Sequence, residues 1–151
     1  MLLHVGWAVD SVYLSAMPLK YPVSAKTILL CDYNMGGFKP PEMVKRRPAI
    51  VLVGRLANRG SLHTVVPLSG SESKADYHCK IQLDNPLPEP FAETIWWVKA
   101  DMVATVSLKR LELFRTQRDN NGNRKYLTGL KVNDEIFDVV KQHVKKAMKL
   151  D

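Results

Sequence analysis

The chain has 151 residues, a mass of 17.1 kDa and 46% hydrophobic residues, which is the size and composition of a single folded domain. Lys and Arg outnumber Asp and Glu by 22 to 15, so the net charge is +7 and the pI is about 9.5. These values exclude a disordered or fibrous protein, and every apolar run is far shorter than the roughly 18 residues of a membrane helix. The two cysteines, Cys31 and Cys79, lack the spacing of a zinc or redox motif, so we expect a reducing, cytoplasmic location. The four histidines have no ligand-like spacing, and the sequence contains no phosphate-loop, dinucleotide or zincin motif, so we expect no metal and no cofactor.

The first residues of the chain differ from the rest. Residues 1–16 are mildly apolar but contain no Lys or Arg, so the charged start of a secretory signal is missing. A second methionine, Met17, opens a more polar stretch. We therefore expect residues 1–26 to be an N-terminal extension, with residues 1–16 either an upstream start-codon artefact or a loosely attached arm. The folded domain is expected at residues 27–151.

All of the surplus positive charge lies in two segments, residues 36–60 and 99–131. If both segments converge on one face, that face attracts a polyanion such as a nucleic acid. The alternative is an ordinary solvated surface with scattered basic side chains, and composition alone does not choose between the two.

Short runs of strand-forming residues follow one another along most of the chain. Residues 27–33 (TILLCDY), 48–54 (PAIVLVG) and 62–68 (LHTVVPL) predict three strands of an antiparallel sheet, because polar or glycine-containing segments separate them. Further short strands are predicted at residues 77–83, 94–99, 102–106 and 108–114. Residues 115–125 (RTQRDNNGNRK) predict a mobile basic loop, in which Asn121-Gly122 favours a turn.

The hydrophobic period changes near the C-terminus. Asn133 is a typical helix N-cap, and the apolar residues that follow at Ile136, Val140 and Val144 have helical spacing. The predicted fold is therefore mostly β, a small and partly closed antiparallel barrel with a C-terminal amphipathic helix.

One pair of residues at the start and end of predicted strands is suited to a phosphate. Arg46 and Arg47 precede the second strand, and Ser69 ends the third. Pairing of these strands would bring the Arg47 guanidinium near the Ser69 hydroxyl, so that both hold one phosphate. The alternative is structural: the arginine pairs with Asp32 or Glu42, and the serine caps a turn.

The histidines and tryptophans can be sorted by their neighbours. His63 lies inside an apolar strand, where a structural role is expected, whereas His78 lies in a polar strand and is a candidate for titration near neutral pH. Adjacent Trp96 and Trp97 must face opposite sides of a strand, so one is expected in the core and the other at the surface or a dimer contact.

Several motifs occur in an order that is similar to that of a known family. They are ILLCDY at residues 28–33, a glycine-containing loop, KRRPAIVL at 45–52, TVVPLS at 64–69 and Ala-Asp-Met at 100–102. This pattern resembles the PemK/MazF family of toxin endoribonucleases. Its most specific parts are the Arg-Pro that opens an apolar strand and the Val-Pro-Leu-Ser about twenty residues later.

The resemblance implies a small SH3-like barrel and a homodimer that cleaves single-stranded RNA without metal, leaving 2′,3′-cyclic phosphate and 5′-hydroxyl ends. It also implies a cognate antitoxin, and DNA binding together with that antitoxin. Arg47 and Ser69 would be the catalytic pair. The family's usual threonine is Ser69 here, which keeps the hydroxyl but loses the methyl group that stiffens the rotamer. Because arginine is a poor base near neutral pH, we predict that Arg47 stabilises the phosphorane and that His78 is the general base.

Single-stranded RNA binds where basic groups surround aromatic rings. The predicted substrate-binding residues are Asp32, Phe38, Lys39, Lys45, Arg46, Trp97, Arg115, Arg118, Arg124 and Lys125. Two alternatives stay open: a non-catalytic CcdB-like toxin that binds gyrase, and an inactive relative retained as a nucleic-acid binder. The pair Arg47 and Ser69 favours the enzyme, and the end of the helix lacks the aromatic signature of CcdB.

Overall fold

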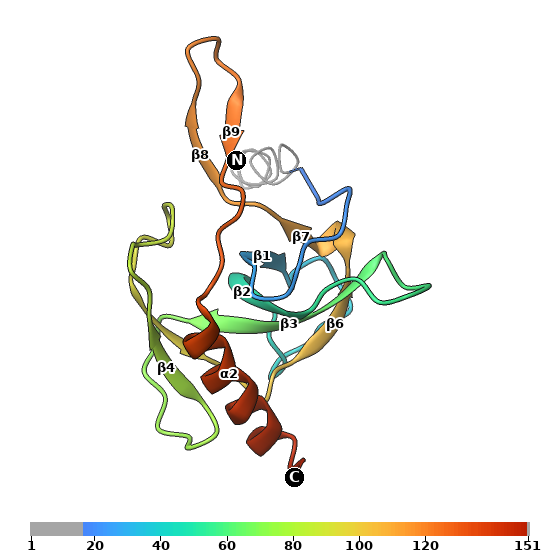
Figure 1. Ribbon diagram of the computed structural model, residues 1–151, viewed down its shortest axis with the longest axis vertical. Helices are drawn as coiled ribbons and strands as arrows, with labels where there is room; N and C mark the ends of the chain where they lie inside the picture. The colour runs from blue at the N-terminus through green and yellow to red at the C-terminus, as the bar shows by residue number, and fades with distance from the viewer. Residues whose placement is uncertain (1–16, 151) are drawn as a thin grey trace, which may run out of the picture.

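The computed structural model describes residues 17–150 (Figure 1). Three central strands pair antiparallel, as predicted: β1 (Ile28–Asp32), β2 (Arg46–Val53) and β3 (Leu62–Ser69). β2 begins two residues before the predicted start, because Arg46 and Arg47 still pair with Asp32 and Cys31 at the end of β1.

Four further strands extend this sheet: β4 (Cys79–Gln82), β5 (Ile95–Val98), β6 (Ala104–Ser107) and β7 (Leu111–Glu112). The order across the sheet is β4-β5-β3-β2-β1-β7. β6 pairs with the first half of β3 and β5 with its end, on the edge that faces away from β2. The sheet curls without closing into a ring, which confirms the predicted mostly β, partly closed antiparallel barrel.

The segment after β6 departs from the prediction. Residues 108–114 are not one strand: a short 3-10 turn, η1 (Leu108–Arg110), precedes the two-residue β7. The hydroxyl of Ser107 accepts a hydrogen bond of 3.1 Å from the backbone N–H of Lys109. This side-chain cap favours the turn over a continued strand.

Residues 115–125 were predicted as a loop, and this prediction is wrong. They belong to a hairpin of β8 (Arg115–Arg118) and β9 (Arg124–Tyr126), which stands away from the rest of the molecule (Figure 1). The Asp119 carboxylate accepts hydrogen bonds from the backbone N–H groups of Asn121 and Asn123, and Gly122 has φ +80°. These turn contacts fix the hairpin where composition indicated only a polar loop.

Two apolar cores lie on the two faces of the sheet, because successive strand residues alternate between faces. We define the barrel core by the buried residues Leu29, Cys31, Tyr33, Ala49, Val51, Val65, Val106, Leu108 and Leu111. The helix-side core includes Leu30, Ile50, Val66, Leu68, Trp96, Val98, Phe114, Phe137 and Val140. Both cores are needed to hold β2 and β3, since each of these strands contributes buried residues to both.

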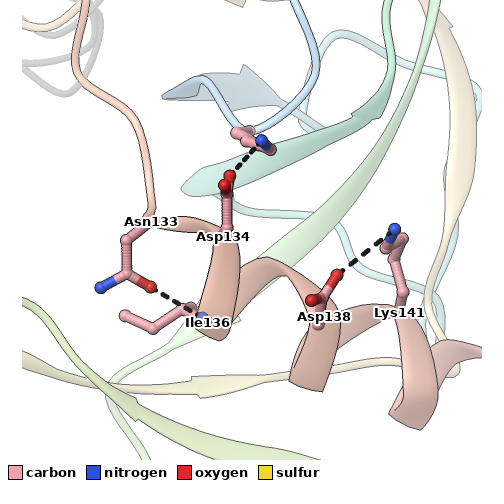
Figure 2. Close-up of polar contacts among 6 residues, drawn as sticks. Asn133, Asp134, Ile136, Asp138 and Lys141 are labelled. Atoms are coloured by element: carbon pink, nitrogen blue, oxygen red, sulfur yellow. Dashed lines mark hydrogen bonds and ion pairs between the residues drawn. The ribbon is translucent and has the colours of Figure 1, made fainter.

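The C-terminal helix α2 (Asp134–Ala147) covers the helix-side core (Figure 1). Figure 2 shows the N-cap that the sequence predicts: the Asn133 side chain accepts a 2.8 Å hydrogen bond from the Ile136 N–H. Asp134 in the first turn forms an ion pair with Lys26. The hydrogen bond from the Lys26 ammonium lowers the pKa of the Asp134 carboxyl below its usual value.

Residues 17–26 pack on the domain. The Leu19 N–H donates to the Leu111 carbonyl at 2.8 Å, and the Val23 N–H donates to Nε2 of His63 at 3.0 Å. His63 is 1% exposed and its Nδ1 lies 2.7 Å from the Leu62 carbonyl, so it has the predicted structural role. The prediction for residues 1–16 lies outside the described residues. Within residues 17–150, no helix is long and apolar enough to cross a membrane.

Candidate active site

Two neighbouring strands bring Arg47 and Ser69 to matching positions. Ala49 on β2 lies opposite Pro67 on β3, so two residues further along each strand Arg47 lies opposite Ser69. Directly opposed residues of an antiparallel pair point to the same face, with Cβ atoms about 4.5–5.5 Å apart. The two side chains are therefore neighbours on the face that carries the barrel core.

This position continues as a row across the sheet. Cys31 lies opposite Arg47, Trp97 lies opposite Ser69, and Lys80 lies opposite Trp97. Trp97 is half-buried on this face, whereas Trp96 is 4% exposed in the helix-side core. The two tryptophans thus divide between core and surface, as the sequence predicts.

The Arg47 side chain lacks a counter-ion among the described residues. Its Nε is buried and has no hydrogen-bond partner there. A buried donor left unpaired costs roughly 1–3 kcal/mol, so an anionic oxygen at this position would be stabilised. The structural alternative for the arginine is not observed, because Asp32 accepts from the Asn34 N–H at 2.9 Å and Glu42 from the Lys39 N–H at 2.7 Å.

Ser69 combines a structural contact with a remaining donor. The residue is 4% exposed, and its hydroxyl oxygen accepts a 3.2 Å hydrogen bond from the Ser71 N–H. This contact is the turn cap that the sequence predicts for Ser69 as the structural alternative to a catalytic role. The hydroxyl proton is not used by the cap, and it can be donated to a phosphate oxygen beside Arg47.

A cavity of about 340 Å³ opens on the same side of the sheet, between the β1–β2 connection and residues 101–104. Its walls include Tyr33, Phe38, Glu42, Met43 and Asp101. Tyr33 is 1% exposed and stacks edge-on against Phe38, with ring centroids 5.5 Å apart. Tyr33 is the second residue after Cys31, and alternation along the strand directs both to the face of Arg47.

Burial acts on two ionisable groups on this side of the sheet, the Cys31 thiol and the Tyr33 hydroxyl. It raises the pKa of the Cys31 thiol to about 12 and raises the pKa of the Tyr33 hydroxyl above its ordinary value. Both groups are therefore protonated at neutral pH. The Tyr33 oxygen has no conventional hydrogen-bond partner among the described residues; its polar neighbour is the Cys31 thiol, a weak partner.

Arg110 holds the β1–β2 connection in place. Its guanidinium donates to the carbonyls of Asp32 at 3.2 Å and Gly36 at 2.6 Å, and it lies 4.9 Å from the centre of the Phe38 ring. The connection that forms one wall of the cavity is thereby tied to the end of η1. Sequence analysis missed this role, since no local pattern links Arg110 to residues more than seventy positions earlier.

His78 is the centre of a hydrogen-bonded chain. Its Nε2 lies 2.5 Å from the Asp101 carboxylate and its Nδ1 lies 2.6 Å from the Ser73 hydroxyl. The His78 side chain is only 9% exposed, whereas that of Asp101 is 38% exposed and lines the cavity. Both ring nitrogens of His78 are therefore engaged, and Asp101 is the member of the chain that faces the cavity. In the sequence, Asp101 is marked only by its place in the Ala-Asp-Met motif at residues 100–102.

The predicted substrate-binding residues do not form one surface. Arg46 lies opposite Asp32 on the other face of the sheet and forms an ion pair with the buried Glu112, which the sequence analysis did not single out. Arg46, Arg115 and Arg124 line a second groove of about 740 Å³, between the proline-rich residues 86–90 and the hairpin. Lys39, Lys45, Arg118 and Lys125 are exposed on the β1–β2 connection and the hairpin.

Comparison with known proteins shows the family to which the chain belongs. The profile of the PemK-like, MazF-like toxins of type II toxin–antitoxin systems matches residues 25–147. The chain belongs to this family. Relatives include YifN of Escherichia coli K12, 38% identical over 65% of this chain and 67% of YifN. An uncharacterised protein of Haemophilus influenzae is 33% identical over 56% of this chain and 65% of its own length. The chain thus spans about two thirds of the length of these relatives.

Solved structures share the fold of this PemK/MazF family member. A crystal structure of MazF from Deinococcus radiodurans superposes with a TM-score of 0.57, at 14% identity over 87% of this chain and 100% of that one. A mycobacterial endoribonuclease in complex with its cognate antitoxin gives a TM-score of 0.56, at 15% identity over 85% and 97% of the two chains. At these identities the likeness establishes the fold.

Proposed function

We propose that this protein is the toxin of a toxin–antitoxin pair and cleaves single-stranded RNA without a metal ion, leaving 2′,3′-cyclic phosphate and 5′-hydroxyl ends. The observation that carries the proposal is the placement of Arg47 opposite Ser69, with the Arg47 Nε–H buried and unpaired. Family membership and the fold shared with endoribonuclease toxins support the same activity.

The chemistry is a transesterification at one phosphate. The ribose 2′-oxygen attacks the adjacent phosphorus and loses its proton to a base, and the bond from phosphorus to the 5′-oxygen breaks as that oxygen takes up a proton. Arg47 neutralises the extra negative charge of the pentavalent phosphorane and protonates the leaving oxygen, while Ser69 donates to a non-bridging oxygen. We keep His78 as the candidate base; to act, its Nδ1 must exchange Ser73 for the 2′-hydroxyl.

The proposal extends to partners. The exposed basic residues of the β1–β2 connection and the hairpin would bind the RNA backbone, and Trp97 and Phe38 would stack on bases. We further propose a cytoplasmic homodimer that a cognate antitoxin neutralises and that binds DNA together with this antitoxin. The mycobacterial endoribonuclease with its cognate antitoxin supports the antitoxin as a partner. Light scattering on the purified chain tests the dimer directly.

The test is cleavage of a long single-stranded RNA in excess EDTA, with the new ends identified by mass spectrometry. The wild type is expected to produce cyclic phosphate and 5′-hydroxyl ends. Arg47→Ala should reduce the rate by about 100-fold or more, the usual effect of removing a donor that stabilises transition-state charge. Arg59→Ala is the matched control, because it removes one exposed arginine in the β2–β3 turn and should leave the rate unchanged.

Two results would overturn the proposal. RNA that stays intact with the wild type would favour a non-catalytic, CcdB-like or nucleic-acid-binding protein. Equal rates for Arg47→Ala and Arg59→Ala would show that the reaction does not depend on the Arg47 position.

A further inference from the structure

The cavity lined by Tyr33 and Phe38 differs in character from a phosphate site. Two carboxylates, those of Asp101 and Glu42, line it together with Phe38 and Met43. Negative groups repel the phosphates of RNA, whereas a neutral base can offer N–H groups to a carboxylate. An apolar, partly aromatic wall with a few polar groups is the usual lining of a site that takes a flat ring.

Both carboxylates keep an oxygen for a ligand. One oxygen of Asp101 contacts His78, and one of Glu42 accepts from the Lys39 N–H; within residues 17–150, the second oxygens have no hydrogen-bond partner. Tyr33, a residue 1% exposed, lines the same cavity, and its hydroxyl has only the weak Cys31 partner. A buried polar group left unpaired is costly, so it is a second, independent sign of a ligand.

The rigid surroundings suit recognition. The Phe38 ring is held by the edge of Tyr33 and by the Arg110 guanidinium, which also anchors the connection through the Gly36 carbonyl. On the opposite wall, the chain from Ser73 through the buried His78 ring restricts the Asp101 carboxylate to one orientation. Reading groups held in this way lose little freedom when a ligand binds.

We propose that this cavity is a base-recognition pocket, in which one unstacked nucleobase of the RNA is held and Asp101 selects bases that carry an amino group over uracil. The inference rests on the proposed RNA-cleaving function and specifies its substrate. Adenine, cytosine and guanine each carry an exocyclic amino group that donates to a carboxylate, and uracil has none. Tyr33 lines the pocket and lies two residues after Cys31, which is opposite Arg47, so the proposal places the base that is read near the scissile phosphate. His78 acts as a positioning residue for Asp101.

The experiment sequences the 5′-hydroxyl ends that the enzyme leaves on an RNA pool of balanced composition. The wild type should exclude uracil at one position near the cut. Asp101→Asn replaces an acceptor with an amide that also donates, so discrimination at that position alone should fall by about 5- to 150-fold, the range for one paired base contact. Asp138→Asn makes the same chemical change on the exposed face of α2 (Figure 2) and should leave the profile unchanged.

Two further variants keep the test decisive. Glu42→Gln changes an exposed residue of the pocket and should lower base discrimination at the same RNA position. It therefore tests the pocket even if Asp101→Asn does not fold. Ser73→Ala removes the hydroxyl that contacts Nδ1 of His78 and leaves the His78 ring in place, so it should weaken discrimination at that position while RNA is still cut.

The outcomes separate the two proposals. If the wild type cuts RNA but Asp101→Asn and Glu42→Gln leave the sequence profile unchanged, the pocket assignment is wrong and the endoribonuclease stands. If the wild type leaves the pool intact, both proposals are overturned.

Discussion

The ion pair between Arg46 and Glu112 offers a test of how the sheet is held together. Glu112 lies in the short edge strand β7, and its side chain is 8% exposed; the Arg46 side chain is 19% exposed. Glu112→Ala would leave the Arg46 guanidinium half-buried without this carboxylate. Removing one partner of a buried pair costs roughly 3–5 kcal/mol, because the other charge stays desolvated.

The lower end of that range applies, since Arg46 lines a groove that water can enter. Unfolding entropy is about 2.1 cal/mol/K per residue, or about 0.3 kcal/mol/K for a chain of this length. A loss of about 3 kcal/mol therefore lowers the Tm by about 10 °C. Replacing both partners in Arg46→Met/Glu112→Leu should restore most of this loss, because apolar residues of similar size pack without a desolvated charge.

The assay is thermal unfolding followed by circular dichroism, with Glu72→Ala as an exposed control that should stay within about 0.5 kcal/mol of the wild type. A Tm for Glu112→Ala within about 2 °C of the wild type would refute the reasoning, since it would mean that water already solvates the pair. RNA cleavage by the double variant then separates the two roles of Arg46. Rates that recover together with the Tm would assign Arg46 to stability, and rates that stay low would support its predicted substrate contact.

Three further predictions concern single residues in or beside the central strands. Ser69→Thr restores the methyl group of the usual threonine, which restricts the side chain to fewer of its three rotamers. We expect kcat on an RNA oligonucleotide to rise by up to about threefold. A fall in kcat would mean that Trp97 leaves no room for the methyl group. Burial raises the pKa of Cys31 in the folded protein to about 12, whereas the thiol of the unfolded chain has a pKa of about 8.5. Above a pH of about 8.5 the unfolded chain therefore loses this proton while the folded protein keeps it, and the free energy of unfolding falls by at most about 1.4 kcal/mol per pH unit. Urea unfolding between pH 8 and 10 should show a shallower loss in Cys31→Ala than in the wild type, and equal slopes would contradict this. Gly54→Ala would place Cβ 2.4 Å from the Val23 carbonyl oxygen, so we expect the variant to be about 1–3 kcal/mol less stable than the wild type. Thermal melting measures this loss. An unchanged Tm would show that residues 22–25 move aside at little cost.

Local sequence patterns determined much of the fold. Runs such as ILLCD and PAIVLV have strand propensity and alternate between two cores, and Asn133 caps the helix through a contact only three residues away. Such features depend on neighbours in the chain, so they can be read without the tertiary structure. The opposition of Arg47 and Ser69 depends in addition on a register shift between Val51 and Val53, which the sequence does not reveal.

Only the tertiary structure shows on which face of the sheet, and at which site, each of the remaining candidate residues lies. Arg46 and Arg47 are adjacent in sequence but face opposite sides of β2, so one meets Glu112 and the other the candidate phosphate site. The carboxylate of Asp101 faces its cavity because His78, from a different strand region, holds it there. These contacts join residues far apart along the chain, and their energies arise from burial and charge pairing that exist only once the sheet has curled.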